Sequence, residues 1–156
     1  MTMPAYPADV LQRAAKIRLI GFDVDGTLTD GRLLYGSSER DAKSFYVQDG
    51  MGLTLLRHAG IELALVTARQ SPVVAARGSE LKIDHVHIGE RSKLACMQRI
   101  AAGMGIGMDE VAFMGDDLPD LATLRGVGLA IAPANAHHWV LPAAHWVTPH
   151  DGGAGA

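Results

Sequence analysis

Short apolar runs alternate along this chain with segments of helical periodicity. Candidate strands cover residues 17–22, 61–66, 84–88, 111–114 and 128–131, with a weaker one near Trp146. Candidate helices cover residues 8–16, 50–58, 71–81, 92–102 and 119–124, with a short piece near Asn135. Strands that alternate with helices form a parallel sheet with helices on both faces. We therefore predict a Rossmann-like, three-layer α/β/α fold with a mainly parallel sheet.

One segment departs from this alternation. Residues 32–35 and 43–47 have strand-like sequences, and they are joined by the turn-rich Gly36-Ser37-Ser38. This pattern predicts a β-hairpin that projects from the sheet, inserted at about residues 31–49. The hairpin is too short to be a separate domain, so residues 1–156 are predicted to form a single domain.

Composition excludes some classes of partner. The 156 residues are 48% apolar and 20% charged, and the formal net charge is −3. This charge argues against nucleic acid as the main partner, because phosphate backbones bind basic surfaces. No apolar run reaches the roughly 18 residues that a membrane span requires. The start of the chain does not resemble an export signal and Cys96 is the single cysteine, so we expect a cytoplasmic protein that acts away from membranes.

Two aspartates follow the first predicted strand. In parallel sheets of this kind, ligands bind beyond the carboxyl ends of the strands, which is where Asp23 and Asp25 lie. Carboxylates this close repel each other unless one is protonated or a cation lies between them. A hard divalent cation with oxygen ligands indicates Mg²⁺. The alternative is structural: Asp25-Gly26 forms a turn and Asp23 caps it.

A second acidic group follows the fourth predicted strand, at Asp116, Asp117 and Asp120. Asp117 could serve only as the cap of the helix that begins near Pro119. One cap needs one carboxylate, so capping leaves Asp116 unexplained. A metal ion held jointly by Asp116 and Asp23 explains it.

The second and third predicted strands are followed by Thr67 and Lys93. A hydroxyl at a strand end is common in turns, and a lysine at a helix start is often a solvated surface residue. Cations are disfavoured at a helix N-terminus, however, unless an anion is bound there. The carboxylates, the hydroxyl and the lysine all fall at one edge of the sheet. Together they predict a phosphoryl-transfer site, in which positioning and charge neutralisation supply most of the catalysis.

These residues resemble the four motifs of the haloacid dehalogenase superfamily. The resemblance runs from about residue 17 to residue 132, and its first motif, residues 23–27, is the most specific. It implies that Asp23 is the nucleophile and a metal ligand, and that Asp116 is a second carboxylate ligand. It also implies that Asp25 is the general acid and base and binds Mg²⁺ through its backbone carbonyl. Thr67 and Lys93 would hold the phosphoryl oxygens, and two residues would support the cluster from outside it: Asp117 and Asp120.

The chain resembles more closely a capless, YrbI-like branch of that superfamily, the 3-deoxy-D-manno-octulosonate 8-phosphate phosphatases. Residues 23–31, 49–52 and 115–120 carry this resemblance. It implies a phosphorylated sugar acid as substrate in lipopolysaccharide precursor synthesis, and a homotetramer whose hairpins pair. Arginine matches a carboxylate with two parallel hydrogen bonds. The residues implied at the sugar-acid end are Arg69, Arg77, Gln48, Asp49 and Gly50, and Gln48 departs from the basic residue usual in the family.

Other readings remain open from the sequence. Near relatives with the same motifs act on nine-carbon, sialic-acid-type 9-phosphates. A non-catalytic member could serve as an oligomeric binding or regulatory module. A signalling receiver domain uses similar residue types, but it places the acidic pair after the first strand and has no counterpart of Asp25.

Overall fold

Six parallel strands form the sheet in the computed structural model, which describes residues 6–35 and 42–156. Their order across the sheet is β3-β2-β1-β4-β5-β6. The strands are β1 Leu19–Phe22, β2 Glu62–Thr67, β3 His85–Ile88, β4 Val111–Met114, β5 Leu129–Ala132 and β6 Trp146–Val147. Every residue of β1, β4 and β5 is buried, as expected for parallel strands covered on both faces.

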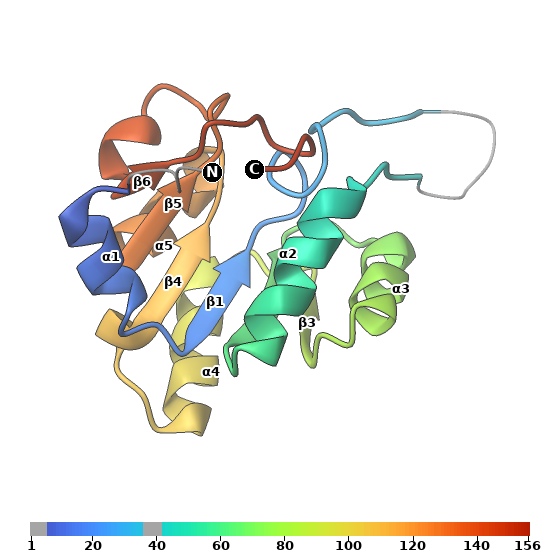
Figure 1. Cartoon of the computed structure of the whole chain (residues 1–156). Coiled ribbons are helices and arrows are strands. Elements are labelled where there is room, and N and C mark those ends of the chain that lie inside the picture. The colour runs from blue at the N-terminus through green and yellow to red at the C-terminus, as the bar shows by residue number, and fades with distance from the viewer. Residues whose placement is uncertain (1–5, 36–41) are drawn as a thin grey trace.

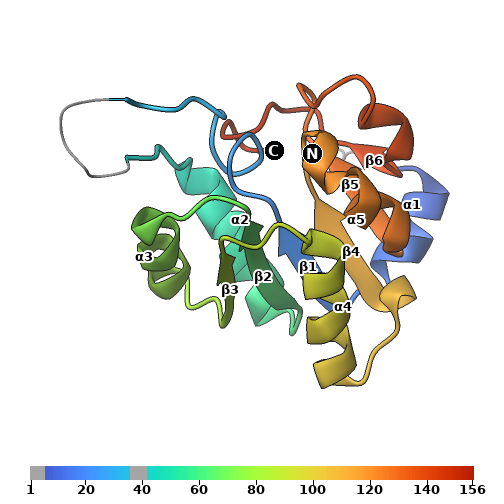
Figure 2. The ribbon, with the colours of Figure 1, turned by 180° about the vertical axis from the view of Figure 1, so that it is seen from behind.

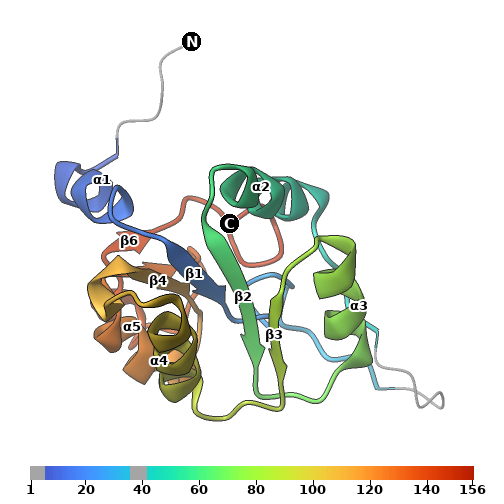
Figure 3. The same cartoon turned by 90° about the horizontal axis from the view of Figure 1, so that it is seen from below.

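Helices cover both faces of this sheet, which gives the predicted three layers (Figures 1 and 2). The α-helices are α1 Ala8–Ala14, α2 Val47–His58, α3 Pro72–Glu80, α4 Lys93–Met104 and α5 Leu121–Gly126. Seen from below, α1 and α2 lie on one side of the sheet, and α4 and α5 lie on the other (Figure 3). The two apolar cores agree with this division: one includes Val10, Leu53 and Val74 from α1, α2 and α3, and the other includes Met97 and Leu124 from α4 and α5.

Local sequence explains several helix ends. Ser71 is the N-cap of α3, where its hydroxyl accepts a hydrogen bond from the backbone N–H of Val74 at 3.4 Å. Pro72 occupies the first helical position, where its missing N–H leaves no bond unmade. Gly60 follows α2 with a φ of +83°, a conformation that glycine adopts without strain.

The strand order reverses at the centre of the sheet, and this fixes the place of the site. Strand β1 pairs with β2 on one side and with β4 on the other, and Phe22 lies opposite both Leu65 and Met114. The chain therefore winds in one direction from β1 to β3 and in the other from β4 to β6. The carboxyl ends of β1 and β4 flank the crevice where ligands bind in such sheets.

The structure differs from the sequence-based prediction in two segments. Helix α2 begins at Val47, three residues before the predicted start at Gly50. The short helix predicted near Asn135 is a turn, and a 3₁₀ helix follows later, at Leu141–Ala143. Proline favours the start of such a helix, and Pro142 lies in this one.

The predicted hairpin falls partly outside the described residues, because its turn lies within residues 36–41. Residues 32–35 and 42–46 on either side are not in strands, and Val47 belongs to α2. An isolated two-stranded hairpin is only marginally stable. The hairpin stays a prediction.

Candidate active site

Asp23 directly follows β1 and is held in a fixed position. Its backbone N–H donates a hydrogen bond to the carbonyl of Met114 at 2.9 Å, and the residue is 6% exposed. The chain then turns at Gly26, whose φ is +95°. A Cβ at Gly26 would lie 2.1 Å from Oδ2 of Asp116, so only glycine lets this loop approach the second acidic loop.

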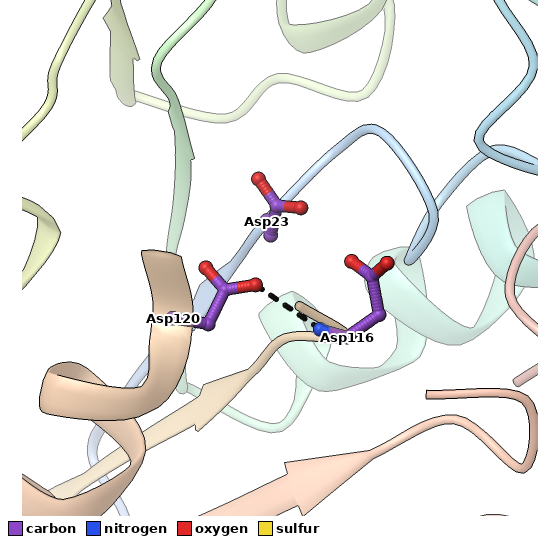
Figure 4. A group of neighbouring side chains, drawn as sticks. All are labelled: Asp23, Asp116 and Asp120. Atoms are coloured by element: carbon purple, nitrogen blue, oxygen red, sulfur yellow. Dashed lines mark hydrogen bonds between the residues drawn. The ribbon is translucent and has the colours of Figure 1, made fainter. Parts of the chain in front are cut away.

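The loop after β4 brings Asp116 and Asp120 to the same place. Asp120 accepts hydrogen bonds through Oδ2 from the backbone N–H groups of Asp116 (3.1 Å) and Asp117 (3.2 Å). Thr27 donates its hydroxyl to Oδ1 of Asp116 at 3.1 Å. Figure 4 shows the side chains of Asp23, Asp116 and Asp120 directed toward one another. One oxygen from each lies within 4.8 Å of the other two, as a shared metal ion requires.

Asp117 has the structural role that the sequence left open. Its carboxylate accepts a hydrogen bond from the backbone N–H of Leu118 at 2.7 Å and caps the 3₁₀ helix Leu118–Asp120. The side chain is exposed, and Asp120 rather than Asp117 completes the acidic group. The cap accounts for Asp117, whereas Asp120 contacts the cluster directly.

Lys93 is the cation within this cluster. It is the first residue of α4, is 5% exposed, and donates hydrogen bonds to Oδ1 of Asp23 (2.5 Å) and Oδ1 of Asp120 (2.6 Å). The alternative of a solvated surface lysine is therefore excluded. Its ammonium connects the loop after β1 to the loop after β4.

The charges in the cluster do not cancel. Three carboxylates and one ammonium leave a formal charge of −2 when all are ionised. Burial, and then the neighbouring Asp120, raise the pKa of Asp23 well above its usual range, although Lys93 opposes this. Burial also raises the pKa of Asp116, with a further contribution from Asp120. Burial lowers the pKa of Lys93, but its attraction to Asp23 and Asp120 outweighs that effect and raises it overall.

These properties fit a divalent cation. The candidate ligand atoms are carboxylate oxygens, which Mg²⁺ prefers, and a charge of +2 would balance the formal excess. A bound cation would also offset the burial and the repulsion between carboxylates that raise the pKa of Asp23 and Asp116.

Asp25 lies between two cations. Lys43 donates to its Oδ1 at 2.6 Å, and Nε of Arg69 lies 3.6 Å from its Oδ2. Sequence reasoning missed Lys43, because it assigned residues 43–47 to a strand of the hairpin. The spacing of 18 residues from Asp25 matches no local motif, so only the folded chain brings the two together.

Thr67 ends β2 and is 2% exposed. Its hydroxyl oxygen accepts a hydrogen bond from the backbone N–H of Arg69 at 3.3 Å. The same turn therefore orients both the hydroxyl expected at the phosphoryl group and the arginine that faces Asp25.

The residues predicted to bind the sugar acid fall into two places. Arg69 lies beside Asp25 and is half exposed. Arg77 pairs instead with Glu80 at 2.9 Å and lies over the ring of Phe45. The start of α2 packs against it: a Cβ at Gly50 would lie 2.5 Å from Nη2 of Arg77. Arg77 thus has structural contacts that explain its position without a ligand.

Asp49 and Gln48 contact the end of the chain. Burial raises the pKa of Asp49, and the backbone N–H of Gly155 opposes this rise. Gln48 and Gly155 also line an apolar cavity of about 750 Å³ between α1, α2 and the sheet. Because that lining is mainly apolar, the cavity does not suit a phosphate ester, and the acidic cluster remains the candidate site.

The C-terminal residues reach the loop after β1, which sequence reasoning did not anticipate. Gly153 donates its backbone N–H to the carbonyl of Thr27 at 3.0 Å, and Gly152 donates to Oδ1 of Asn135 at 3.0 Å. A Cβ at Gly152 would lie 1.8 Å from the carbonyl oxygen of Gly26. The tail and the loop after β1 lie side by side (Figure 1).

None of the helices in the described part of the chain has the length and apolar character needed to cross a bilayer.

Known proteins resemble this chain in a family model, in sequence and in solved structures. The family described as haloacid dehalogenase-like hydrolase matches residues 76–155, which include Lys93 and the loop after β4. The 3-deoxy-D-manno-octulosonate 8-phosphate phosphatase KdsC of Yersinia pestis is 40% identical over 148 residues, which are 95% of this chain and 79% of that protein.

Solved structures agree in fold. The hypothetical protein XCC2798 of Xanthomonas campestris superposes with a TM-score of 0.94 at 49% identity, covering 99% of this chain and 87% of that one. The 3-deoxy-D-manno-octulosonate 8-phosphate phosphatase of Moraxella catarrhalis, solved with magnesium, phosphate and the sugar acid KDO, superposes with a TM-score of 0.94 at 38% identity. That match covers 97% of this chain and 87% of the Moraxella protein. The chain belongs to the haloacid dehalogenase-like hydrolases, alongside the 3-deoxy-D-manno-octulosonate 8-phosphate phosphatases.

Proposed function

We propose that this protein is a magnesium-dependent phosphomonoesterase that hydrolyses 3-deoxy-D-manno-octulosonate 8-phosphate to the free sugar acid and phosphate. The observation that carries the reaction is the buried cluster, in which Lys93 lies between Asp23 and Asp120 and an excess of negative charge remains. The substrate is supported by relatives of that name at about 40% identity over nearly the whole chain.

The reaction divides into two transfers of the phosphoryl group, first from the substrate to Asp23 and then from Asp23 to water. A carboxylate oxygen of Asp23 attacks phosphorus, a new P–O bond forms, and the bond from phosphorus to the sugar oxygen breaks. Asp25 donates its proton to the leaving sugar oxygen. Water then attacks the aspartyl-phosphate and gives a proton to Asp25, and phosphate leaves as the Asp23 carboxylate is restored.

The remaining residues hold the phosphoryl group and the metal. Asp23 and Asp116 would bind Mg²⁺ through their carboxylates, with the backbone carbonyl of Asp25 as a further ligand. When bound, the ion neutralises charge on the phosphoryl oxygens and orients them for attack. Thr67 and Lys93 would hold those oxygens. Asp120 fixes Lys93 and the loop that carries Asp116 through the hydrogen bonds described above.

The sugar-acid end of the substrate would lie on the side of Asp25 that faces Arg69. Arg69 is half exposed beside Asp25, so its guanidinium can reach a bound carboxylate. Arg77, Gln48, Asp49 and Gly50 surround the start of α2 and would complete this end. The Moraxella relative, solved with KDO and phosphate, supports a substrate of this class.

The assembly and the cellular role belong to the same proposal. We expect a homotetramer formed through residues 31–49, a cytoplasmic location and a place in lipopolysaccharide precursor synthesis. Light scattering checks the assembly: a fully active monomer would remove the shared site from the proposal.

The test is phosphate release from three substrates, each with Mg²⁺ and with EDTA. The substrates are 3-deoxy-D-manno-octulosonate 8-phosphate, a nine-carbon keto-sugar-acid 9-phosphate and p-nitrophenyl phosphate. We expect fast, EDTA-sensitive release that favours the eight-carbon substrate. Preference for the nine-carbon acid would keep the reaction and replace the substrate. No release from any of the three would favour a non-catalytic binding module and refute the proposal.

A further inference from the structure

Lys43 is a buried lysine outside the motifs that identify the site. It lies on the segment that leads into α2, and its side chain is 3% exposed. Its ammonium donates a hydrogen bond of 2.6 Å to Oδ1 of Asp25. Lysine is rarely fully buried unless its charge is paired, and the hydrogen bond to Asp25 is one such pairing.

The two cations beside Asp25 differ in how firmly they are held. Lys43 contacts Oδ1 at hydrogen-bond distance and is almost inaccessible, whereas Arg69 is 52% exposed and its Nε lies 3.6 Å from Oδ2. One carboxylate oxygen is therefore fixed from inside the protein. The other oxygen faces a side chain that is free to turn toward a ligand.

Stability alone does not explain such a pair. Removing two charges from water costs about as much as their attraction returns, so a buried ion pair is often no more stabilising than apolar residues of the same volume. A side chain that must face a reacting atom does gain from an anchor, since catalysis requires an orientation within about 10–20°.

We propose that Lys43 is a positioning residue for Asp25. It holds Oδ1 so that Oδ2 points at the leaving sugar oxygen and, in the second step, at the attacking water. This inference rests on the proposed function, because it assumes that Asp25 exchanges a proton with those two oxygens.

The test compares Lys43→Met, Lys43→Arg and the control Lys16→Met with wild-type protein. Methionine keeps the length and apolar stem of the side chain without its charge, and Lys16 is exposed. We expect Lys43→Met to lower kcat on the sugar-acid phosphate about a hundredfold, the lower range for loss of acid–base catalysis, with KM changed less than about threefold. Lys43→Arg should recover about tenfold of this loss, because arginine can still pair with Asp25.

A second readout separates positioning from folding. With p-nitrophenyl phosphate the leaving group needs little help from an acid, so Lys43→Met should release a rapid burst of nitrophenolate and then turn over slowly. The burst should approach one equivalent per active site, as in Asp25→Asn. A partly unfolded variant would give a smaller burst and a lower melting temperature instead.

Three results would overturn the inference. Lys43→Met could keep kcat within threefold of wild type, its loss of activity could follow the loss of folded protein, or Lys43→Arg could fail to recover any activity. A wild-type protein without phosphatase activity would overturn the proposed function, and this inference with it. An active wild type beside an unaffected Lys43→Met overturns the role of Lys43 alone.

Discussion

Replacing Lys93 by methionine should destabilise the metal-free protein more than an ordinary surface substitution would. The ammonium of Lys93 lies 2.5 Å from Asp23 and 2.6 Å from Asp120, and those side chains are only 9% and 1% exposed. Lys93→Met leaves both carboxylates buried beside each other without their cation. Breaking a buried ion pair from one side costs about 3–5 kcal/mol. For a chain of this length, that lowers the melting temperature by roughly 6–20 °C.

Thermal unfolding at pH 7 in EDTA measures this cost, with Lys16→Met as the exposed control. The double variant Lys93→Met/Asp120→Asn removes one of the two carboxylate charges that Lys93→Met leaves unpaired, so it should melt above Lys93→Met alone. Added Mg²⁺ should also restore part of the lost stability, because it replaces the missing positive charge. A loss below about 1 kcal/mol, or a double variant that melts no higher than Lys93→Met, would contradict the proposed coupling of these groups.

The acidic cluster and the loop after β1 should respond to perturbation in three further ways. Mg²⁺ at 100 times its dissociation constant should stabilise wild-type protein by about 2.7 kcal/mol and Asp116→Asn much less, as measured by melting with and without EDTA. Equal shifts of the melting temperature in the two proteins would show that Asp116 is not a metal ligand. Burial raises the pKa of Asp116, so the metal-free wild-type fold loses stability as pH rises through that pKa. In EDTA, the melting temperature of Asp116→Asn relative to wild type should therefore rise from about pH 4 to pH 7. A difference that stays constant with pH would refute this. Gly26→Ala places a methyl group against Asp116 at a φ of +95° and should lower kcat about a hundredfold. Gly52→Ala, with no atom within 4 Å of its new Cβ, should leave kcat unchanged. An unchanged kcat in both variants would show that the loop after β1 tolerates the methyl group.

The parts of the fold that repeat a pattern could be predicted from the sequence. Buried parallel strands are short apolar runs, so β1 and β4 were predicted to within two residues. Because all parallel strands end at one edge, the same pattern brought Asp23, Thr67 and Asp116 to that edge without knowledge of the strand order. The capping role of Asp117 was also recognisable, since Pro119 follows it in a common helix-start pattern.

The contacts that could not be predicted join segments with no shared pattern. Lys43 meets Asp25 across 18 residues of sequence, and no periodicity encodes that contact. The tail reaches Thr27 through backbone groups of glycine, which leave no side-chain signal in the sequence. The side-chain partners of Arg77, including Glu80 and Phe45, likewise depend on how α3 packs beside the start of α2.

In the proposed reaction, Asp23 carries the phosphoryl group between the two steps. The most direct measurement is intact-protein and peptide mass spectrometry of Asp25→Asn after rapid mixing with substrate and Mg²⁺, beside Asp23→Asn treated in the same way. We expect a phosphoryl adduct in Asp25→Asn that forms within the mixing time, decays slowly and maps to the peptide containing Asp23, with none in Asp23→Asn. A phosphoryl group on another residue, or turnover by Asp23→Asn at the wild-type rate, would contradict the account.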